Sequence, residues 1–250
     1  MSAQTSHDVS SAAAQRDIPP EMMYTPPDRP AAWDEGAILP VDKPEGCSSF
    51  DVVEAVRDGT GVQKVGHAGT LDPLASGLLL ILVARPATRL QAACMHLPKT
   101  YEATLRLGET TPSHDTETDV VERADPTGIP RHDLEAVSDE FVGHLNQVPP
   151  MYSAVKIDGE RLYEKARRGE TVNRPPRQVH VDRFEILEWS PPDCSARIEC
   201  SKGTYIRALA RDVGEELGVG AHLTALRRTA IGPFAVEDSW SLEGLTNTLS

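Results

Sequence analysis

The chain has 250 residues, of which 39% are hydrophobic, enough for one large domain or two small ones. Its longest apolar stretch, residues 78–84, is too short to cross a membrane. The N-terminal residues have neither the basic nor the apolar region of a secretion signal, so we expect a cytoplasmic protein. The net charge of −13 excludes no class of ligand, because a total charge does not say where a ligand binds.

The first 35 residues are rich in Ser, Ala, Pro, Asp and Gln and show no hydrophobic period, which predicts a disordered tail. A short strand is expected at 37–44. A helix is expected at 51–57, capped by Ser48 or Ser49 and ended by Gly59. The next elements are a loop around 67–73 and a strand at 78–83.

The second half of the chain mixes strands and helices. Strands are expected at 99–107, 179–187 and 196–200, and helices near 133–143 and over 205–217, the last ended by Gly218. A loop is expected between 109 and 131. The spacing is not that of regular βαβ units, so the sequence predicts a mixed α+β fold, a largely antiparallel sheet with flanking helices.

Charge is unevenly distributed along this half. Residues 109–141 contain ten acidic and two basic residues, whereas residues 156–183 contain eight basic and five acidic residues. An acidic protein can therefore still present a cationic surface to a nucleic acid.

No metal or cofactor motif is present in the sequence. The four cysteines, Cys47, Cys94, Cys194 and Cys200, form no C-x-x-C pair and have no histidines at zinc-ligand spacing. Neither a P-loop nor a G-x-G-x-x-G fingerprint occurs. We therefore expect no metal and no cofactor.

The segment 66–77 is the strongest candidate for a functional loop. It contains three glycines, and Asp72 stands directly before Pro73, which favours an extended backbone at the aspartate. A carboxylate displayed on such a loop is a candidate nucleophile or base. Taken alone, however, an aspartate in a glycine-rich loop is more often a turn residue.

Several further segments occur with this loop: Asp42-Lys43-Pro44-x-Gly-x-Ser48-Ser49, Lys99-Thr100-Tyr101, Pro149-Pro150-Met151-Tyr152-Ser153-Ala154-Val155-Lys156, Ser201-Lys202-Gly203-Thr204-Tyr205-Ile206-Arg207 and Ala221-His222-Leu223-Thr224-Ala225-Leu226-Arg227-Arg228-Thr229. In order and spacing they resemble the bacterial TruB-type tRNA pseudouridine synthases, over residues 37–235. The agreement of several independent motifs makes a chance match negligible.

The resemblance implies an isomerase that converts uridine 55 in the T-loop of elongator tRNAs to pseudouridine, without a cofactor. The implied partner is the T-arm of tRNA, with no membrane and no obligatory protein partner. Residues 36–250 would form the catalytic domain, with an RNA-gripping insertion at about 149–178. The C-terminal RNA-binding domain usual in the family is expected to be reduced or absent.

The resemblance also implies roles for three catalytic residues. Asp72 matches the family's aspartate and acts as an ion, and the sequence leaves open whether it attacks the sugar, attacks the base or removes a ribose proton. Arg207 is expected to supply the opposing charge that keeps this carboxylate ionised. Tyr101 matches a tyrosine that stacks on the target base. Without the match, these would be a surface arginine and a packing tyrosine.

Substrate contacts are implied for His67, Tyr205 and Leu226. His67 is expected to insert into the RNA and stabilise the flipped-out uridine, although a histidine in such a loop otherwise favours a backbone hydrogen bond. Tyr205 and Leu226 are expected to contact the flipped nucleotide, with core packing as the alternative for Leu226. Lys43 and Pro44 are expected to support the loop of Asp72.

The basic part of the insertion is expected to bind RNA through phosphates and shape. The alternative is a solvated helix face. The residues concerned are Lys156, Arg161, Lys165, Arg167, Arg168, Arg174 and Arg177.

Three competing functions were weighed. A tRNA-binding or tRNA-folding protein without catalysis would tolerate damage at the three catalytic positions, yet all three residues are present. A glycosidase would need a second carboxylate, and no partner is evident near the motifs. The guide-RNA pseudouridine synthases carry a long C-terminal domain, so the stand-alone enzyme is preferred.

Overall fold

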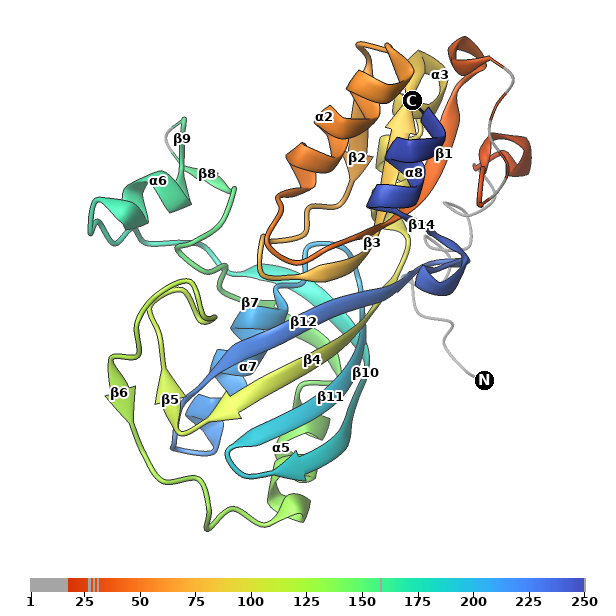
Figure 1. The fold of residues 1–250 in the computed structure, drawn as a ribbon. Coiled ribbons are helices and arrows are strands. Elements are labelled where there is room, and N and C mark those ends of the chain that lie inside the picture. Colours follow the sequence, from red (N-terminus) through yellow and green to blue (C-terminus); the bar gives the residue numbers. More distant parts are fainter. Residues whose placement is uncertain (1–17, 27, 29, 31, 158, 250) are drawn as a thin grey trace, which may run out of the picture. The chain divides into compact units, whose positions relative to one another are not determined.

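The computed structural model describes residues 18–26, 28, 30, 32–157 and 159–249 (Figure 1). The chain forms two compact units: a first unit of residues 1–101 and 226–250, and a second unit of residues 102–225. Strands β4 (Lys99–Leu107) and β12 (Ala221–Ile231) each belong in part to both units. The sequence predicted one catalytic domain over 36–250, and the division within it is seen only in the structure.

The first unit is built around strand β3 (Ser76–Val83). Strand β1 (Ala37–Lys43) pairs with it antiparallel over its whole length, from Ala37 opposite Val83 to Lys43 opposite Gly77. Strand β14 (Trp240–Ser241) adds to β1 in parallel. On the other edge, β2 (Val65–Ala68) pairs antiparallel and the end of β12 pairs parallel with β3.

Both faces of β3 are covered by core residues. Leu78, Leu80 and Leu82 pack in one hydrophobic cluster, together with residues of α3 (Ala84–Thr88) and α4 (Gln91–His96). Leu79 and Ile81 pack in the other cluster, beneath α2 (Ser49–Thr60) and α8 (Leu242–Leu249). A strand covered on both sides has no polar face, which explains its continuous apolar sequence.

Helix α2 begins where the sequence predicted. Ser48 accepts a hydrogen bond from the Asp51 amide, and Asp51 accepts one from the Ser48 amide, which together form a capping box. The helix continues beyond Gly59 and ends at Gly61, whose left-handed conformation (φ 69°) terminates it. The predicted stop at Gly59 is therefore wrong by two residues, because glycine ends a helix only where the backbone turns left-handed.

The predicted disordered tail is corrected for residues 18–26. Ile18 is buried in the first unit's core, and a short 3-10 turn follows at Pro20–Met22. The Tyr24 amide donates to the Ile38 carbonyl at 3.1 Å, and the Trp240 indole donates to the Tyr24 carbonyl at 3.1 Å. Apolar side chains thus fix a segment whose composition suggested disorder. Residues 1–17 lie outside the described residues.

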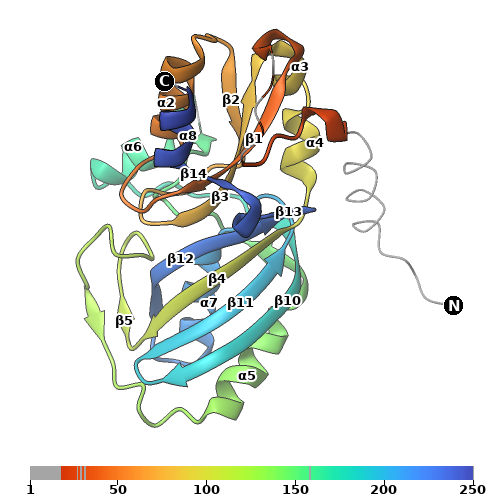
Figure 2. The same ribbon diagram turned by 45° about the vertical axis from the view of Figure 1, so that its right-hand side comes forward.

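The second unit contains the antiparallel strands β7 (Gly143–Gln147), β10 (Arg177–Ser190) and β11 (Asp193–Cys200), in the order β12-β4-β11-β10-β7. Figure 2 shows β12, β4, β11 and β10 side by side, and β7 is labelled in Figure 1. Helix α5 (Arg131–Glu140) packs on β10, and helix α7 (Ile206–Glu216) follows β11 in the chain. The predicted strand at 99–107 is confirmed as β4, and the predicted helices near 133–143 and 205–217 correspond to α5 and α7.

Two short strand pairs complete the second unit. Strands β5 (Glu109–Thr110) and β6 (Glu122–Arg123) pair antiparallel inside the segment that was predicted to be a loop. Strands β8 (Lys156–Ile157) and β9 (Glu160–Arg161) precede helix α6 (Leu162–Arg167) in the insertion. The mixed, largely antiparallel α+β fold class is confirmed. No helix in the described part of the chain is long and apolar enough to span a membrane.

Gly77 provides a test of this packing. Its φ is 102°, and an added Cβ would lie 2.3 Å from the Arg228 carbonyl oxygen and 2.7 Å from the Arg228 nitrogen. We expect Gly77→Ala to lower the free energy of unfolding by about 3 kcal/mol in urea titrations, since both backbone strain and a backbone clash result. Gly46→Ala is the control, because Gly46 also has a positive φ (85°) but no neighbour within 4 Å. Its expected cost is about 1 kcal/mol. Equal costs for the two variants would contradict the packing described for β3 and β12.

Candidate active site

The loop that carries Asp72 connects β2 to β3. The Ala75 amide donates to the Asp72 carbonyl at 3.0 Å, which closes a turn with Pro73 at its second position. The Ser49 hydroxyl at the start of α2 donates to the Leu71 carbonyl at 3.0 Å and accepts from the Leu71 amide at 2.8 Å. The Asp72 side chain is half-buried. The carboxylate is therefore displayed from a backbone that is fixed on both sides.

Lys43 is the last residue of β1 and lies opposite Gly77 of β3. Its side chain is fully buried, and Nζ donates to the carbonyls of Pro44 (2.8 Å) and Cys47 (2.7 Å). Burial lowers the pKa of the amine, while the charges of Cys47 and Asp72 oppose that change. The Gly46 amide donates to the Pro73 carbonyl at 2.8 Å, so the segment after Pro44 also binds the loop directly.

Arg228 is a second support, which the sequence analysis did not single out. Its guanidinium is buried, and it donates to the Leu78 carbonyl at 2.6 Å and to the Gly69 carbonyl at 3.0 Å. Gly69 lies before Asp72 and Leu78 lies after it. One side chain thus holds both ends of the loop.

His67 lies on strand β2, opposite Ile81, and not in the loop predicted for it. The strand was not predicted, because it has only four residues and two of them, Gly66 and Ala68, are small, so no alternation of polar and apolar side chains is visible. Burial and the charge of Arg228 lower the pKa of the imidazole, so the ring is neutral at pH 7. Its Nδ1 is buried without a hydrogen-bond partner. The backbone hydrogen bond expected of such a histidine involves only its carbonyl, which accepts from Gln91 at 2.8 Å.

Tyr101 and Leu226 both belong to the first unit and are nearly buried. Leu226 directly precedes Arg227, which lies opposite Ser76 at the end of the Asp72 loop. Tyr101 follows Thr100, whose carbonyl accepts from the Thr229 hydroxyl at 3.4 Å. The two residues therefore lie on neighbouring strands of one sheet, although 125 positions separate them in the sequence.

Arg207 lies in the first turn of α7 in the second unit, with 4% of its side chain exposed. It donates to the carbonyls of Ser113 (3.1 Å) and Tyr152 (2.8 Å). Its Nη1 lies 3.3 Å from Oδ2 of Asp115, a carboxylate that is only 1% exposed. The sequence analysis counted Asp115 as part of an acidic loop, and no local signal marks it as the partner of a residue 92 positions away.

Tyr205 is the N-cap residue of α7, and Gln147 of β7 fixes its backbone. The Tyr205 amide donates to Oε1 of Gln147 at 2.8 Å, and Nε2 of Gln147 donates to the Tyr205 carbonyl at 3.1 Å. The buried Gln147 side chain thus satisfies both backbone groups of the N-cap residue, whose own side chain makes no cap hydrogen bond. The first turn of α7, with Arg207, is therefore held at its start.

The basic residues of the insertion are largely engaged by acidic or aromatic neighbours. Arg168 contacts Glu160 at 2.5 Å and Glu170 at 2.8 Å. Arg167 contacts Glu117 at 3.1 Å, and its guanidinium lies 5.6 Å from the Tyr163 ring. The remaining contacts are Lys165 with Glu160 at 3.8 Å and Arg161 with the Tyr163 hydroxyl at 3.1 Å. Exposed pairs of this kind contribute little stability, so an RNA phosphate could replace the carboxylates.

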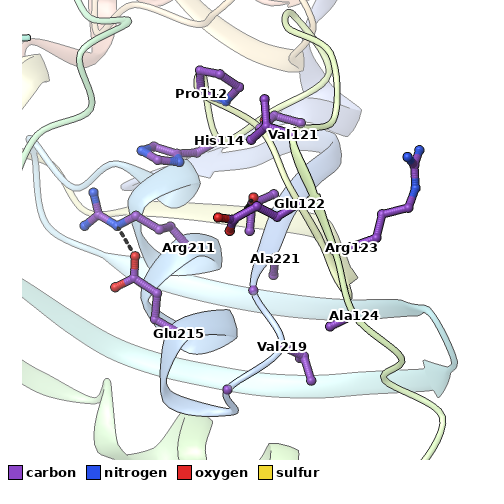
Figure 3. A pocket seen from close by; sticks show the side chains of 14 residues that line it. Pro112, His114, Val121, Glu122, Arg123, Ala124, Arg211, Glu215, Val219 and Ala221 are labelled. Carbon is purple, nitrogen blue, oxygen red and sulfur yellow. Dashed lines mark hydrogen bonds and ion pairs between the residues drawn. The ribbon is translucent and has the colours of Figure 1, made fainter.

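Near Arg207, the second unit has a pocket of about 730 Å³ between the β5–β6 segment and α7 (Figure 3). His114 and Arg211 line one side, and Arg211 lies 3.9 Å from Glu215. Burial lowers the pKa of His114 to about 4, helped by the charges of Arg211, Arg207 and Arg174. The imidazole is therefore neutral at pH 7.

No cluster of metal-binding side chains occurs in the part of the chain that the structure describes. Cys47, Cys94, Cys194 and Cys200, all within the described residues, form no disulfide. Burial raises the pKa of Cys94 to about 11 and that of Cys194 to about 12, so both are protonated and unreactive at neutral pH.

Comparison with known proteins gives the site its context. The chain is 47% identical over 216 residues to a protein of Mycobacterium sp. (strain KMS) named tRNA pseudouridine synthase B, covering 85% of this chain and 72% of that protein. Proteins of the same name from Thermobifida fusca (47% identity; 84% and 74% coverage) and Bordetella avium (45%; 83% and 86%) are also similar. Among solved structures, a Cbf5-Nop10-Gar1 complex contains a chain with a TM-score of 0.67 and 31% identity. The match covers 92% of this chain and 60% of that one.

These similarities define the class as the pseudouridine synthases. Residues 57–206 match the family described as TruB family pseudouridylate synthase, N-terminal domain, and residues 207–250 match the tRNA pseudouridylate synthase B C-terminal domain. The chain belongs to the TruB family of pseudouridylate synthases and is therefore an isomerase.

The Arg207 contacts lead to a prediction for Asp115. Asp115→Asn keeps the size of the side chain but removes the buried charge that lies beside the Arg207 guanidinium. We expect the free energy of unfolding to fall by about 3 kcal/mol, and kcat to fall by about 100-fold because Arg207 shifts. Asp193→Asn is the control, since it removes an exposed ion pair with Arg106 in the same unit. Similar small losses in both variants would show that Arg207 does not depend on Asp115.

His114 leads to a prediction about pH. The pKa of His114 is about 4 in the folded chain, against an ordinary value of about 6.5 when unfolded. Between these values the unfolded chain binds the extra proton, so stability should fall as the pH drops from about 6.5 to 4, by up to about 3 kcal/mol. His114→Asn, which suits the positive φ of 60°, should show a smaller fall in urea titrations across this range. An unchanged slope would contradict the lowered pKa.

Proposed function

We propose that this chain isomerises uridine 55 in the T-loop of elongator tRNAs to pseudouridine, with Asp72 as the catalytic nucleophile. That the chain is a pseudouridine synthase acting on tRNA follows from its family and from relatives of 45–47% identity over most of its length. The choice of uridine 55 and the role of Asp72 extend that conclusion.

The observation that supports the proposal most is that the backbone of the loop around Asp72 is held in place by side chains and amides from other segments. The loop is bound by the Ser49 hydroxyl and by the Gly46 amide, and Arg228 closes both ends. A turn residue with a purely structural role needs no such support from three distant elements. Preorganised groups are what catalysis requires, because a small misplacement costs a large factor in rate.

The reaction needs no net change in composition. The N1–C1′ glycosidic bond breaks, the base turns, and C1′ bonds to C5 of the same uracil. C5 then loses its hydrogen as a proton, and N1 gains a proton. The proposal gives Arg207 the role of keeping Asp72 ionised and Tyr101 that of stacking on the base, as expected from the sequence.

Substrate binding completes the proposal. The target base must leave its stack at a cost of a few kcal/mol, and His67 would occupy the vacated space as a neutral ring. Tyr205 and Leu226 would contact the flipped nucleotide. The seven basic residues of the insertion would bind the phosphates of the T-arm, and Lys165, Arg167 and Arg168 would exchange their carboxylate partners for phosphates. A cytoplasmic location belongs to the same proposal, since the substrate is tRNA.

A tRNA-binding or tRNA-folding protein without catalysis remains the alternative. It shares the insertion and the fold, so only turnover distinguishes the two. The buried pair of Arg207 with Asp115 favours catalysis, because a surface that only binds phosphates has no need of a buried, oriented arginine.

The decisive measurement uses unmodified tRNA transcript labelled with tritium at uridine C5. The wild-type chain should release tritium from one T-loop uridine, and Asp72→Asn should lower the rate by about 10⁴-fold or more. Asp58→Asn, at an exposed position of α2, should retain the wild-type rate. If the wild type and Asp72→Asn both bind tRNA and neither releases tritium, the catalytic proposal fails and the binding alternative replaces it.

A further inference from the structure

Phe50 has the most exposed aromatic side chain among the residues that the structure describes, at 53%. It is the second residue of α2, within the capping-box turn formed by Ser48 and Asp51. The core-facing positions of this helix are Val52, Val53 and Val56, so Phe50 contributes little to the hydrophobic core. An exposed phenylalanine at an ordered helix start therefore needs a reason other than packing.

The backbone of Phe50 is tied to the catalytic loop. Its neighbour Ser49 forms both hydrogen bonds to Leu71, the residue before Asp72. The capping box fixes the first turn of the helix, so the position of Phe50 relative to this loop is fixed as well.

The ring of Phe50 is held by Arg57. The Arg57 guanidinium carbon lies 5.5 Å from the ring centroid, in the range of a cation–π contact. The two residues are seven positions apart, two helical turns, and so lie on the same face of α2. Nη2 of Arg57 also donates to the Val65 carbonyl at 3.0 Å, on the strand that carries His67.

Arg57 thus connects α2 to β2. Ser49 is the first residue of α2, and His67 lies on β2. Arg57 keeps a buried Nε without a hydrogen-bond partner, so its placement is determined by the ring and the Val65 carbonyl. A ring whose orientation is already fixed loses little entropy when a planar ligand stacks on it.

We infer that Phe50 stacks on an unpaired base of the RNA substrate, as a contact additional to those that hold the target uridine. Any base has a π-face, so this contact gives affinity without reading sequence. Arg57 behind the ring adds positive charge where the RNA backbone approaches. The inference rests on the proposed function, because it requires RNA at the Asp72 loop.

The test separates stacking from apolar contact. In the Asp72→Asn background, which removes turnover, the Kd for unmodified tRNA transcript is measured for Phe50→Leu, Phe50→Ala and Phe50→Trp. Stacking predicts about tenfold weaker binding for Leu and Ala and wild-type or tighter binding for Trp. Leu187→Ala removes an exposed hydrophobic side chain from the second unit and should leave the Kd unchanged.

Two further measurements keep the outcomes distinct. Melting temperatures of all variants should match the parent, since the side chain is mostly exposed. In the catalytically active background, Phe50→Leu should raise KM about tenfold and leave kcat unchanged. Wild-type affinity in Phe50→Leu, or equal weakening in Phe50→Leu and Phe50→Trp, would overturn the inference. Tritium release by the chain with Asp72 intact would still support the proposed function in that case. If the chain with Asp72 intact neither binds tRNA nor releases tritium from it, the proposed function itself is rejected.

Discussion

The geometry of the loop that carries Asp72 depends on one buried guanidinium. Arg228 donates to a carbonyl before Asp72 and to another after it, so the loop between Gly69 and Leu78 is closed by a side chain from a distant strand. A buried charge is costly, and here carbonyl oxygens compensate for the lost hydration. The same residue approaches Gly77 so closely that only glycine fits there. The conformation of the Asp72 loop, the pairing of β3 with β12 and the position of Arg228 therefore depend on one another.

Charge is used in two different ways within the second unit. Arg207 and Asp115 form a buried pair, in which removal of the carboxylate charge from beside the guanidinium is costly. The insertion instead carries exposed pairs, such as those of Arg167 and Arg168 with glutamates, which exchange partners at little cost. The fixed pair thus involves Arg207, for which a catalytic role is proposed. The exchangeable pairs lie in the insertion, where the RNA backbone is proposed to bind.

The fold could be predicted in outline because strong local patterns agree with it. The alternation in 99–107 gives β4, and the apolar face and final glycine of 205–217 give α7. Short elements were not predicted. Strand β2, for example, has four residues, and its two small ones leave no alternation of polar and apolar side chains. Residues 18–26 were assigned to a disordered tail, yet Ile18 and Tyr24 attach them to the core through contacts with distant residues.

The sequence by itself determined the family, the motif residues and the α+β class, because these depend on local order and spacing. Only the tertiary structure decided which side chains support them. Arg228 reaches Gly69, and Asp115 pairs with Arg207, across separations of 159 and 92 positions. No local pattern encodes such partners, since a hydrogen bond requires distance and direction, and both are fixed only when strands and helices pack.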